Sequence, residues 1–369
     1  MSNILILPDS FKGSIDTQTF CDIATTAIKD ISSNSKVDSY AISDGGDGSL
    51  TTLNKLLGGK ILQGKVTDSN FFSQMASYGV GDDFAIIEIS SCAGLSKCLI
   101  RNPLYTTTFG VGEQIKLAKM LNKKNIYLCL GGSSTNDAGA GILCALGAKF
   151  YNEDIKEFVP VGNTLGQVCK MDLDEFYKNT DGINLIGLCD VNNPLLGDKG
   201  CSYIYAKQKG ANDTEVQLLE ENMQKWASVT EFLGVDAQLS GNGAAGGIGY
   251  MVSAFFGGKL ISGIDFVLDK INFAEIVGNY NYIITGEGQF DTTSIMGKVV
   301  GGILKRNSNK NAKVVVVCGK NKFNEDIGSK GIYSVIELND KNKNLQENMA
   351  NTDKNLNEAI RSFAKRENL

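Results

Sequence analysis

Two apolar, strand-like runs in this chain end abruptly in loops rich in glycine, carboxylates and hydroxyls. Residues 282–298 read YIITGEGQFDTTSIMGK, and residues 126–141 read IYLCLGGSSTNDAGAG. Glycine lets the backbone come close to a ligand, and the amides at the start of a following helix face an anion. The two loops therefore indicate binding of a nucleotide or a phosphorylated substrate at the ends of strands.

The length and charge of the chain limit its class. Its 369 residues exceed the ~250 to 300 at which single cores stop growing, so two domains are expected. A net charge of -5 leaves no broad basic surface for nucleic acid. The apolar runs are shorter than the ~20 residues of a membrane helix, and residues 1–9 carry no export signal. We expect a cytoplasmic protein that binds neither nucleic acid nor membrane.

The chain contains no histidine, which narrows its chemistry. Histidine-dependent triads and histidine-ligated zinc are excluded, and a general base has to be Asp, Glu, Lys, Tyr or Cys. None of the nine cysteines forms a Cys-x-x-Cys pair, so reduced core thiols are expected. Phosphoryl transfer suits this composition, because its loose transition state needs mainly metal, cationic groups and aligned oxygens.

The two ends of the chain alternate between strand and helix patterns. A helix is predicted after Asp16, its N-cap, and strands are predicted at residues 4–7, 39–43, 282–285, 314–318 and 334–338. We assign residues 1–59 and 280–369 to one Rossmann-like, doubly wound parallel sheet, which binds ligands at the carboxyl ends of its strands. Residues 339–357 are polar enough to be a mobile connection into the last helix.

The middle of the chain has a different pattern. Turn signals at residues 68–70 and 81–83 separate alternating segments, which predicts antiparallel hairpins. Helical spacing follows at residues 112–124, 138–147 and 215–233. We therefore expect residues 60–279 to form an inserted second α/β domain.

Polar loops follow several of the predicted strands. Asp9, Ser10 and Lys12 after the first strand suit a hydroxy acid or a phosphate, although an ordinary capped turn also explains Asp9. The loop DGGDG from Asp44 offers two carboxylates for a metal or a hydroxyl, or is a solvated turn. Asp190 directly follows an apolar run, and magnesium commonly takes one or two such carboxylates.

The chain contains one common nucleotide-binding pattern and lacks another. Residues 241–246 match GxGxxG, but residues 234–240 form no convincing strand, so close helix packing or a phosphate-binding helix start is favoured over a nicotinamide site. The pattern GxxxxGK[ST] is absent, because Gly297 and Lys298 are followed by Val299. A kinase with this sequence is not of the P-loop type.

Nine ordered blocks of the sequence resemble the glycerate kinase family, which phosphorylates glycerate with ATP and is unrelated to P-loop kinases. The blocks are residues 8–14, 43–48, 87–95, 101–113, 131–141, 189–195, 207–211, 241–249 and 285–298. The resemblance implies two α/β domains with the active site in the cleft between them, ATP with Mg²⁺ as donor, and glycerate as acceptor. Two positions depart from the family pattern: Gln289 stands where arginine is common, and Thr293 where glutamine is common.

The resemblance also guides a hypothesis about roles. Lys12, Asp190 and Asp291 are the predicted catalytic residues, with Asp190 or Asp291 as proton acceptor, and Mg²⁺ is expected at Asp190, Glu287 and Asp291. Glycerate is expected at Asp9, Ser10, Asp44 and Arg101, where Arg101 either binds the carboxylate or forms a surface salt bridge. The predicted nucleotide ligands are Gly131, Gly132, Ser133, Ser134, Thr135, Asp137 and Lys298.

Two other functions remain as alternatives. A nicotinamide-dependent oxidoreductase of a small hydroxy acid requires a strand before Gly241. A non-catalytic sugar-acid sensor on a kinase scaffold would bind without forming ADP. The sequence favours the 2-phosphoglycerate product over 3-phosphoglycerate only through the resemblance, and it leaves a homodimer open.

Overall fold

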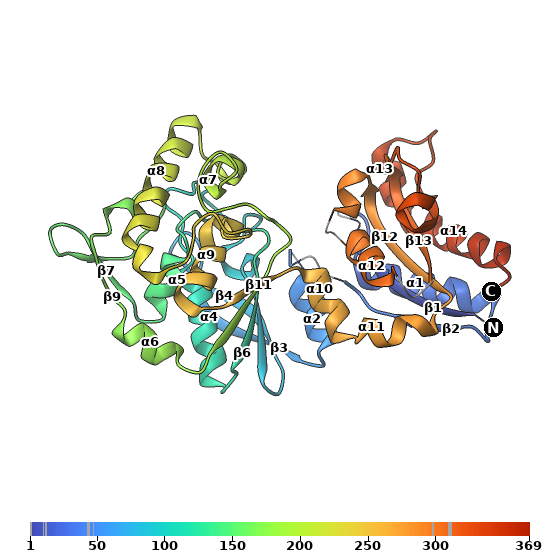
Figure 1. Cartoon of the computed structure of the whole chain (residues 1–369), viewed down its shortest axis with the longest axis horizontal. Coiled ribbons are helices and arrows are strands. Elements are labelled where there is room, and N and C mark those ends of the chain that lie inside the picture. The colour runs from blue at the N-terminus through green and yellow to red at the C-terminus, as the bar shows by residue number, and fades with distance from the viewer. Residues whose placement is uncertain are drawn as a thin grey trace. The chain divides into compact units, whose positions relative to one another are not determined.

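The chain forms two compact units (Figure 1). The computed structural model describes residues 2–9, 11, 13–42, 45–46, 48–296, 299–308 and 312–369. Unit 1 consists of Met1–Asp44 and Gly263–Leu369, and unit 2 is the continuous segment Gly45–Ser262. Unit 2 is therefore inserted into the sequence of unit 1.

Unit 1 is built on a five-stranded sheet in which all neighbouring strands are parallel. The order across the sheet is β14-β13-β12-β1-β2. The strands are β1 (Asn3–Pro8), β2 (Lys36–Ser39), β12 (Tyr282–Phe290), β13 (Lys313–Asn321) and β14 (Ile332–Glu337). The central strands β1, β12 and β13 contain continuous apolar runs with buried side chains, as expected for a parallel sheet covered on both faces.

Helices cover both faces of this sheet. On one face α1 and α14 pack against each other and against strand residues that include Ile4, Ile284 and Val315. On the other face the neighbouring residue Val316 packs with Val300 of α12, because successive side chains of a strand point to opposite faces. The helices are α1 (Thr17–Ile31), α10 (Gly263–Lys270), α11 (Phe273–Ile276), α12 (Val299–Asn307), α13 (Leu345–Ala350) and α14 (Thr352–Arg366), with single turns η4 (Val277–Asn279), η5 (Thr292–Ile295) and η6 (Gly328–Lys330). The predicted doubly wound parallel sheet is confirmed.

Local predictions in unit 1 hold at some positions and fail at others. Asp16 is the N-cap of α1 and accepts a hydrogen bond of 2.7 Å from the Thr19 amide. The strand predicted at residues 39–43 is wrong, because β2 already ends at Ser39. β12 is longer than its apolar run: it pairs with β13 as far as Phe290, so Glu287 lies within the strand. Residues 339–357, expected to be mobile, include α13 and the start of α14.

Unit 2 contains a six-stranded sheet with the order β11-β10-β6-β5-β4-β3. The strands are β3 (Lys60–Thr67), β4 (Ser73–Val80), β5 (Phe84–Glu88), β6 (Asn125–Cys129), β10 (Asn184–Leu188) and β11 (Lys259–Ile261). β3, β4 and β5 form the predicted antiparallel hairpins, and β5, β6, β10 and β11 run parallel. A separate small sheet has the order β8-β7-β9, with β7 (Lys149–Tyr151), β8 (Glu157–Phe158) and β9 (Lys170–Asp172).

The six-stranded sheet is also covered on both faces. On β4, Tyr78 belongs to the large core cluster with Val111 and Ile115 of α4, whereas the neighbouring Gly79 faces Leu50 of α2. The helices of unit 2 are α2 (Ser49–Leu56), α3 (Ser90–Ala93), α4 (Phe109–Met120), α5 (Ala140–Ala145), α6 (Asp174–Thr180), α7 (Cys201–Tyr205), α8 (Asp213–Val229) and α9 (Ala244–Phe256), with turns η1 (Leu165–Gln167), η2 (Lys207–Lys209) and η3 (Glu231–Leu233).

The boundaries between the two units lie at residues 44/45 and 262/263, whereas we expected them at 59/60 and 279/280. Helix α2, which we assigned to the first domain, packs against β3, β4 and β5 of unit 2. Helices α10 and α11, which we assigned to the insertion, pack against α12 of unit 1. An amphipathic helix beside a boundary carries the same apolar pattern whichever sheet it covers.

Candidate active site

Unit 1 has a topological switch point between β1 and β12. Numbered within this unit, its strands follow the order 2-1-3-4-5, and sheets of this kind bind ligands beyond the carboxyl ends of the two strands at the switch point. Asp9 directly follows β1, and its amide donates a hydrogen bond of 2.7 Å to the carbonyl of Gly286. Glu287 is the next residue of β12, so two predicted site residues come from adjacent strands: Asp9 directly after β1, and Glu287 within β12.

The loop after β1 is anchored on both sides of its predicted site residues. Phe11 is buried and packs on Phe20, with ring centroids 5.5 Å apart. The Ser14 hydroxyl donates to the carbonyl of Met349 over 3.2 Å. Gly13 has a φ of +79°, and a Cβ there would lie 2.9 Å from the Met349 side chain. Ser10 and Lys12, predicted in this loop, lie outside the described residues, as does Lys298, a predicted nucleotide ligand after β12.

Asp291 caps the short turn η5 after β12. One carboxylate oxygen accepts hydrogen bonds from the Thr293 amide (2.9 Å) and the Thr293 hydroxyl (2.7 Å). The other oxygen accepts from the Gln289 side-chain amide at 2.8 Å. Gln289 and Thr293 are the two positions that depart from the family pattern, and here both are neutral partners of a predicted metal ligand.

In unit 2 the carboxyl ends of β5, β6 and β10 lie side by side. The strand register aligns Glu88 with Cys129 and Cys129 with Leu188, so Glu88, the loop from Gly131 and Asp190 share one edge of the sheet. Asp190 is half-buried.

The glycine-rich loop before α2 reaches this same edge. A Glu88 carboxylate oxygen accepts a hydrogen bond of 2.6 Å from the Gly48 amide, and the Gly131 amide donates to the Gly45 carbonyl over 2.8 Å. A Cβ on Gly131 would lie 2.4 Å from the Cα of Gly46, so only glycine permits this approach. Asp44, the predicted glycerate ligand of this loop, lies outside the described residues.

The predicted nucleotide loop is tightly held by its own side chains. Asp137 is fully buried and accepts hydrogen bonds from the Thr108 amide (2.9 Å), the Thr108 hydroxyl (2.8 Å), and the amides of Gly139 (3.2 Å) and Gly141 (3.3 Å). Burial raises the pKa of this carboxyl, although the four hydrogen bonds oppose the shift. The amides of Gly139 and Gly141 at the start of α5 therefore already face an anion, the carboxylate of Asp137.

The GxGxxG match serves backbone packing in this structure. Residues 234–240, all described, contain no strand, so the context that a dinucleotide site requires is missing. Gly246 has a φ of +71°, and a Cβ there would lie 2.1 Å from the Thr135 carbonyl. The Ala138 amide donates to the Gly246 carbonyl over 3.0 Å. This segment packs against the predicted nucleotide loop from one side, which agrees with close packing, one of the two interpretations favoured over a nicotinamide site.

Arg101, a predicted glycerate ligand, lies beside Gly210, and the preceding residue Lys209 contacts the predicted nucleotide loop. The side chain of Arg101 is exposed, and its carbonyl lies 2.1 Å from where a Cβ on Gly210 would be. Next to Gly210 is Lys209, whose side chain is buried and whose ammonium donates to the Ser133 hydroxyl (2.9 Å) and the Thr135 carbonyl (2.7 Å). Lys209 lies in the family-like block at residues 207–211, but no role was predicted for it from the sequence.

The predicted magnesium ligands come from both units. Asp190 belongs to unit 2, whereas Glu287 and Asp291 belong to unit 1. Within the part of the chain that the structure describes, no group of three or more Cys, Asp or Glu side chains is arranged to hold a metal ion. The oxygen donors of these three side chains are of the type that magnesium prefers, with one or two carboxylates and the rest of its shell from water and phosphate.

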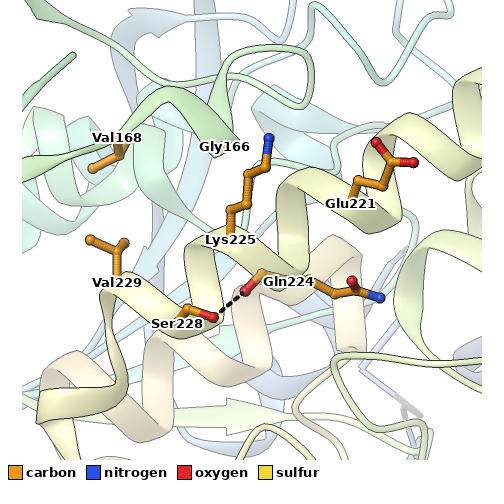
Figure 2. A pocket seen from close by; sticks show the side chains of 7 residues that line it. All are labelled: Gly166, Val168, Glu221, Gln224, Lys225, Ser228 and Val229. Carbon is orange, nitrogen blue, oxygen red and sulfur yellow. Dashed lines mark hydrogen bonds between the residues drawn. The ribbon is translucent and has the colours of Figure 1, made fainter. Parts of the chain in front are cut away.

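A surface hollow of about 760 Å³ lies elsewhere in unit 2 (Figure 2). Its lining comes from α8 and the segment around η1: Gly166, Val168, Glu221, Gln224, Lys225, Ser228 and Val229. None of the predicted site residues lines it.

Among the described residues, no helix combines the length and apolarity needed to cross a membrane.

The chain is similar to known proteins over nearly its whole length. The model of the glycerate kinase family matches residues 4–367. The chain is 33% identical to the glycerate kinase of Bacillus cereus (strain ATCC 10987 / NRS 248), over 98% of this chain and 97% of that protein. It is also 33% identical to the glycerate 2-kinase of Escherichia coli (strain K12), over 88% of this chain and 86% of that protein. A crystal structure assigned to glycerate kinase 2 of Salmonella typhimurium LT2 has a TM-score of 0.87 and 29% identity, and covers 100% of this chain and 98% of that one.

The fold and these comparisons define an enzyme class. The protein is an α/β kinase, a phosphotransferase that lacks the P-loop pattern and acts on a small molecule. More specifically, the chain belongs to the glycerate kinase family.

Proposed function

We propose that the protein transfers the γ-phosphate of ATP to a hydroxyl of D-glycerate and forms 2-phosphoglycerate in preference to 3-phosphoglycerate. The observation that carries this proposal is the match to glycerate kinases along nearly the full chain, including a relative named glycerate 2-kinase. Both strand edges described above also offer the carboxylates and close backbone approaches that such a reaction uses.

The proposal divides the work between the two units. In unit 1, Asp9 at the switch point, with Ser10 and Lys12 after it, would bind the acceptor. In unit 2, the edge formed by Glu88, the loop from Gly131 and Asp190 would receive the phosphates. The two-unit active site implied by the resemblance remains part of the proposal.

Asp190 is the proposed proton acceptor, and Asp291 is the alternative. Asp190 suits this role because it is half-buried and follows β10 at the sheet edge that it shares with Glu88 and the loop from Gly131. Mg²⁺ held by some of Asp190, Glu287 and Asp291 would neutralise charge on the phosphates. Because phosphoryl transfer is mainly positioning and charge stabilisation, a weak base late in the reaction is sufficient.

The test is ADP formation from ATP with D-glycerate and MgCl₂, followed by phosphorus NMR of the product. We expect glycerate-dependent turnover that EDTA abolishes, a phosphate on the 2-hydroxyl, and a loss of about 100-fold or more in kcat for Asp190→Asn. Asp181→Asn, a change at an exposed aspartate of the same unit, is the control. Glycerate binding without ADP formation would favour the sensor, and glycerate-dependent reduction of NAD would favour the oxidoreductase.

A further inference from the structure

Lys209 is a buried cation in an unusual setting. It ends the turn η2, only 2% of its surface is exposed, and its two hydrogen-bond acceptors, the Ser133 hydroxyl and the Thr135 carbonyl, are both neutral. Burial of an ammonium without an ion-pair partner costs stability. A charge kept at such a cost is a candidate for a functional role.

The acceptors of Lys209 belong to the loop of residues 131–137, which is held from several sides. The Ser134 amide and hydroxyl both donate to the Ala93 carbonyl, at 2.8 and 2.9 Å. The Thr106 hydroxyl donates to the Ser134 carbonyl over 2.9 Å, and the Leu95 amide donates to the Gly132 carbonyl over 2.8 Å. In this set of contacts, Lys209 is the cationic donor.

The same loop contains two buried polar side-chain atoms whose hydrogen-bonding capacity is not used by the described residues. Thr135 Oγ1 and Asn136 Oδ1 are buried and have no hydrogen-bond partner among the described residues. Buried polar atoms are usually paired, so unpaired ones mark a segment whose shape is not set by stability alone. The loop therefore combines a buried charge with unsatisfied groups, and it begins at the sheet edge that also carries Glu88 and Asp190.

We propose that Lys209 is a positioning residue for phosphoryl transfer: its ammonium holds the loop of residues 131–137 in the shape that receives the anionic phosphates of the nucleotide. This inference rests on the proposed kinase function. Lys209 acts through Ser133 and Thr135 and does not itself touch the substrate.

Titration of Lys209 supplies a distinctive signature. Burial lowers the pKa of its ammonium to about 8, while the negative charge of Asp137 on the loop after β6 acts against this shift. Cys201 on α7 also faces this ammonium, but burial raises the pKa of its thiol to about 12, so the thiol stays protonated and uncharged in the relevant range. The charge on Lys209 is lost as pH rises through about 8, and the neutral amine that remains donates weaker hydrogen bonds to Ser133 and Thr135.

The experiment compares wild type, Lys209→Met and the matched control Lys207→Met. Lys207 lies in the same turn, but its side chain is exposed and pairs with Asp213. For Lys209→Met we expect kcat/KM to fall at least 10-fold, a melting temperature equal to or above that of wild type, and no decline in residual activity between pH 7 and pH 9. Wild type and Lys207→Met should both lose activity in this interval.

A second readout does not depend on turnover. Hydrogen–deuterium exchange of peptides covering residues 131–137 should be faster in Lys209→Met than in wild type, and unchanged in Lys207→Met. Unchanged exchange in Lys209→Met, or wild-type kcat/KM with the alkaline decline intact, would overturn the proposal. If wild type shows no glycerate-dependent turnover but exchange still rises, the kinase function fails while the hold of Lys209 on the loop stands.

Discussion

Asp137 shows how one residue can resemble a ligand contact and yet face inward. The sequence places it in a glycine-rich loop before a helix, where a phosphate would be expected. In the structure its carboxylate is fully buried and accepts four hydrogen bonds from Thr108, Gly139 and Gly141. The carboxylate joins the start of α4 to the start of α5, so its visible role is to hold two helices together.

We therefore predict that Asp137→Ala lowers the free energy of unfolding by about 3 kcal/mol, because it leaves buried donors without an acceptor. Urea denaturation followed by circular dichroism measures the change. Asp154→Ala, a change at an exposed aspartate of the same unit, is the control. If Asp137 instead serves as a direct nucleotide ligand, Asp137→Ala will unfold at the wild-type urea concentration and raise the KM for ATP.

At the residue scale, the sequence was sufficient to predict a side chain's role where its hydrogen-bond partner lies a few residues away in the chain. Asp16 was predicted as an N-cap because its partner, the Thr19 amide, is three residues away. Asp137 accepts hydrogen bonds from Thr108, and Lys209 donates one to Ser133; both partners are distant in the chain. A lysine in a short turn carries no periodic signal, so its burial became visible only in the folded chain.

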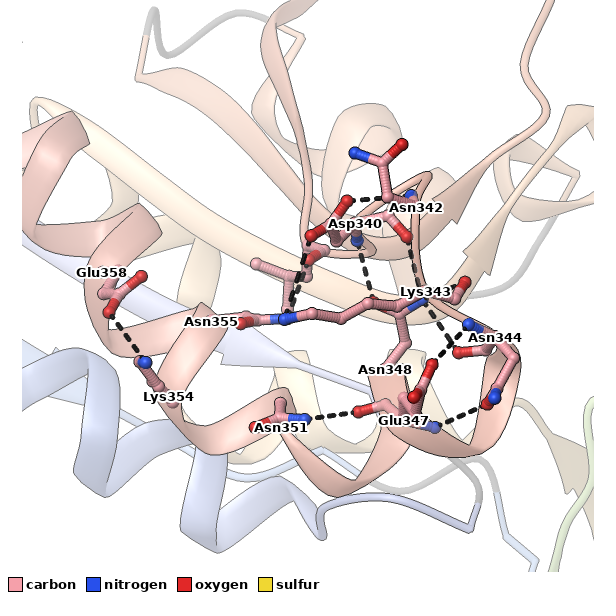
Figure 3. Close-up of polar contacts among 11 residues, drawn as sticks. Asp340, Asn342, Lys343, Asn344, Glu347, Asn348, Asn351, Lys354, Asn355 and Glu358 are labelled. Atoms are coloured by element: carbon pink, nitrogen blue, oxygen red, sulfur yellow. Dashed lines mark hydrogen bonds and ion pairs between the residues drawn. The ribbon is translucent and has the colours of Figure 1, made fainter.

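At the scale of elements, the segment before the last helix has an order that its composition does not reveal (Figure 3). Asn344 and Glu347 form a capping box at the start of α13. Asn348 is buried: its side-chain amide donates to the carbonyls of Asp340, Lys343 and Asn344, and its side-chain oxygen accepts from the Asp340 amide at 2.8 Å. Asparagine-rich sequence was interpreted as mobile because its side chains bury little apolar surface, but here they satisfy backbone groups.

We predict that Asn348→Ala lowers the free energy of unfolding by about 2 kcal/mol, because it removes these bonds from a buried site. Lys354→Ala is the matched control, since the Lys354–Glu358 pair shown in Figure 3 is exposed and worth about 0.3 to 0.5 kcal/mol. Chemical denaturation of both variants measures the difference. Equal effects of the two changes would show that residues 340–350 are not held by Asn348.

The strands were easier to predict than their ends. β1, β12 and β13 are buried on both faces, so their continuous apolar runs were visible in the sequence. Glu287 lies beyond the apolar run of β12, yet β13 continues to pair with this part of the strand. Hydrogen bonding to a neighbouring strand extends β12 where its own composition predicts a loop.

At the scale of the whole molecule, each of the two units contains a core cluster of its own. The large core cluster that includes Tyr78, Val111 and Ile115 lies entirely within unit 2, and the cluster that joins α1, α14 and the parallel sheet lies entirely within unit 1. A domain with its own core can in principle fold alone. The inserted arrangement was predictable because strand–helix alternation stops and resumes, whereas the exact boundary depends on which sheet each helix covers.

We predict that residues 45–262, expressed alone, fold into a cooperative unit, whereas residues 263–369 alone do not. The first fragment keeps both of its sheets and its core intact. The second lacks β1, which pairs with β12 and β2 in the middle of the sheet, and lacks α1, which covers Ile284 and Val315. Circular dichroism and urea denaturation of each fragment provide the measurement, and addition of residues 1–44 to the second should restore a cooperative transition. A disordered 45–262 fragment would show that unit 2 depends on unit 1 for its stability.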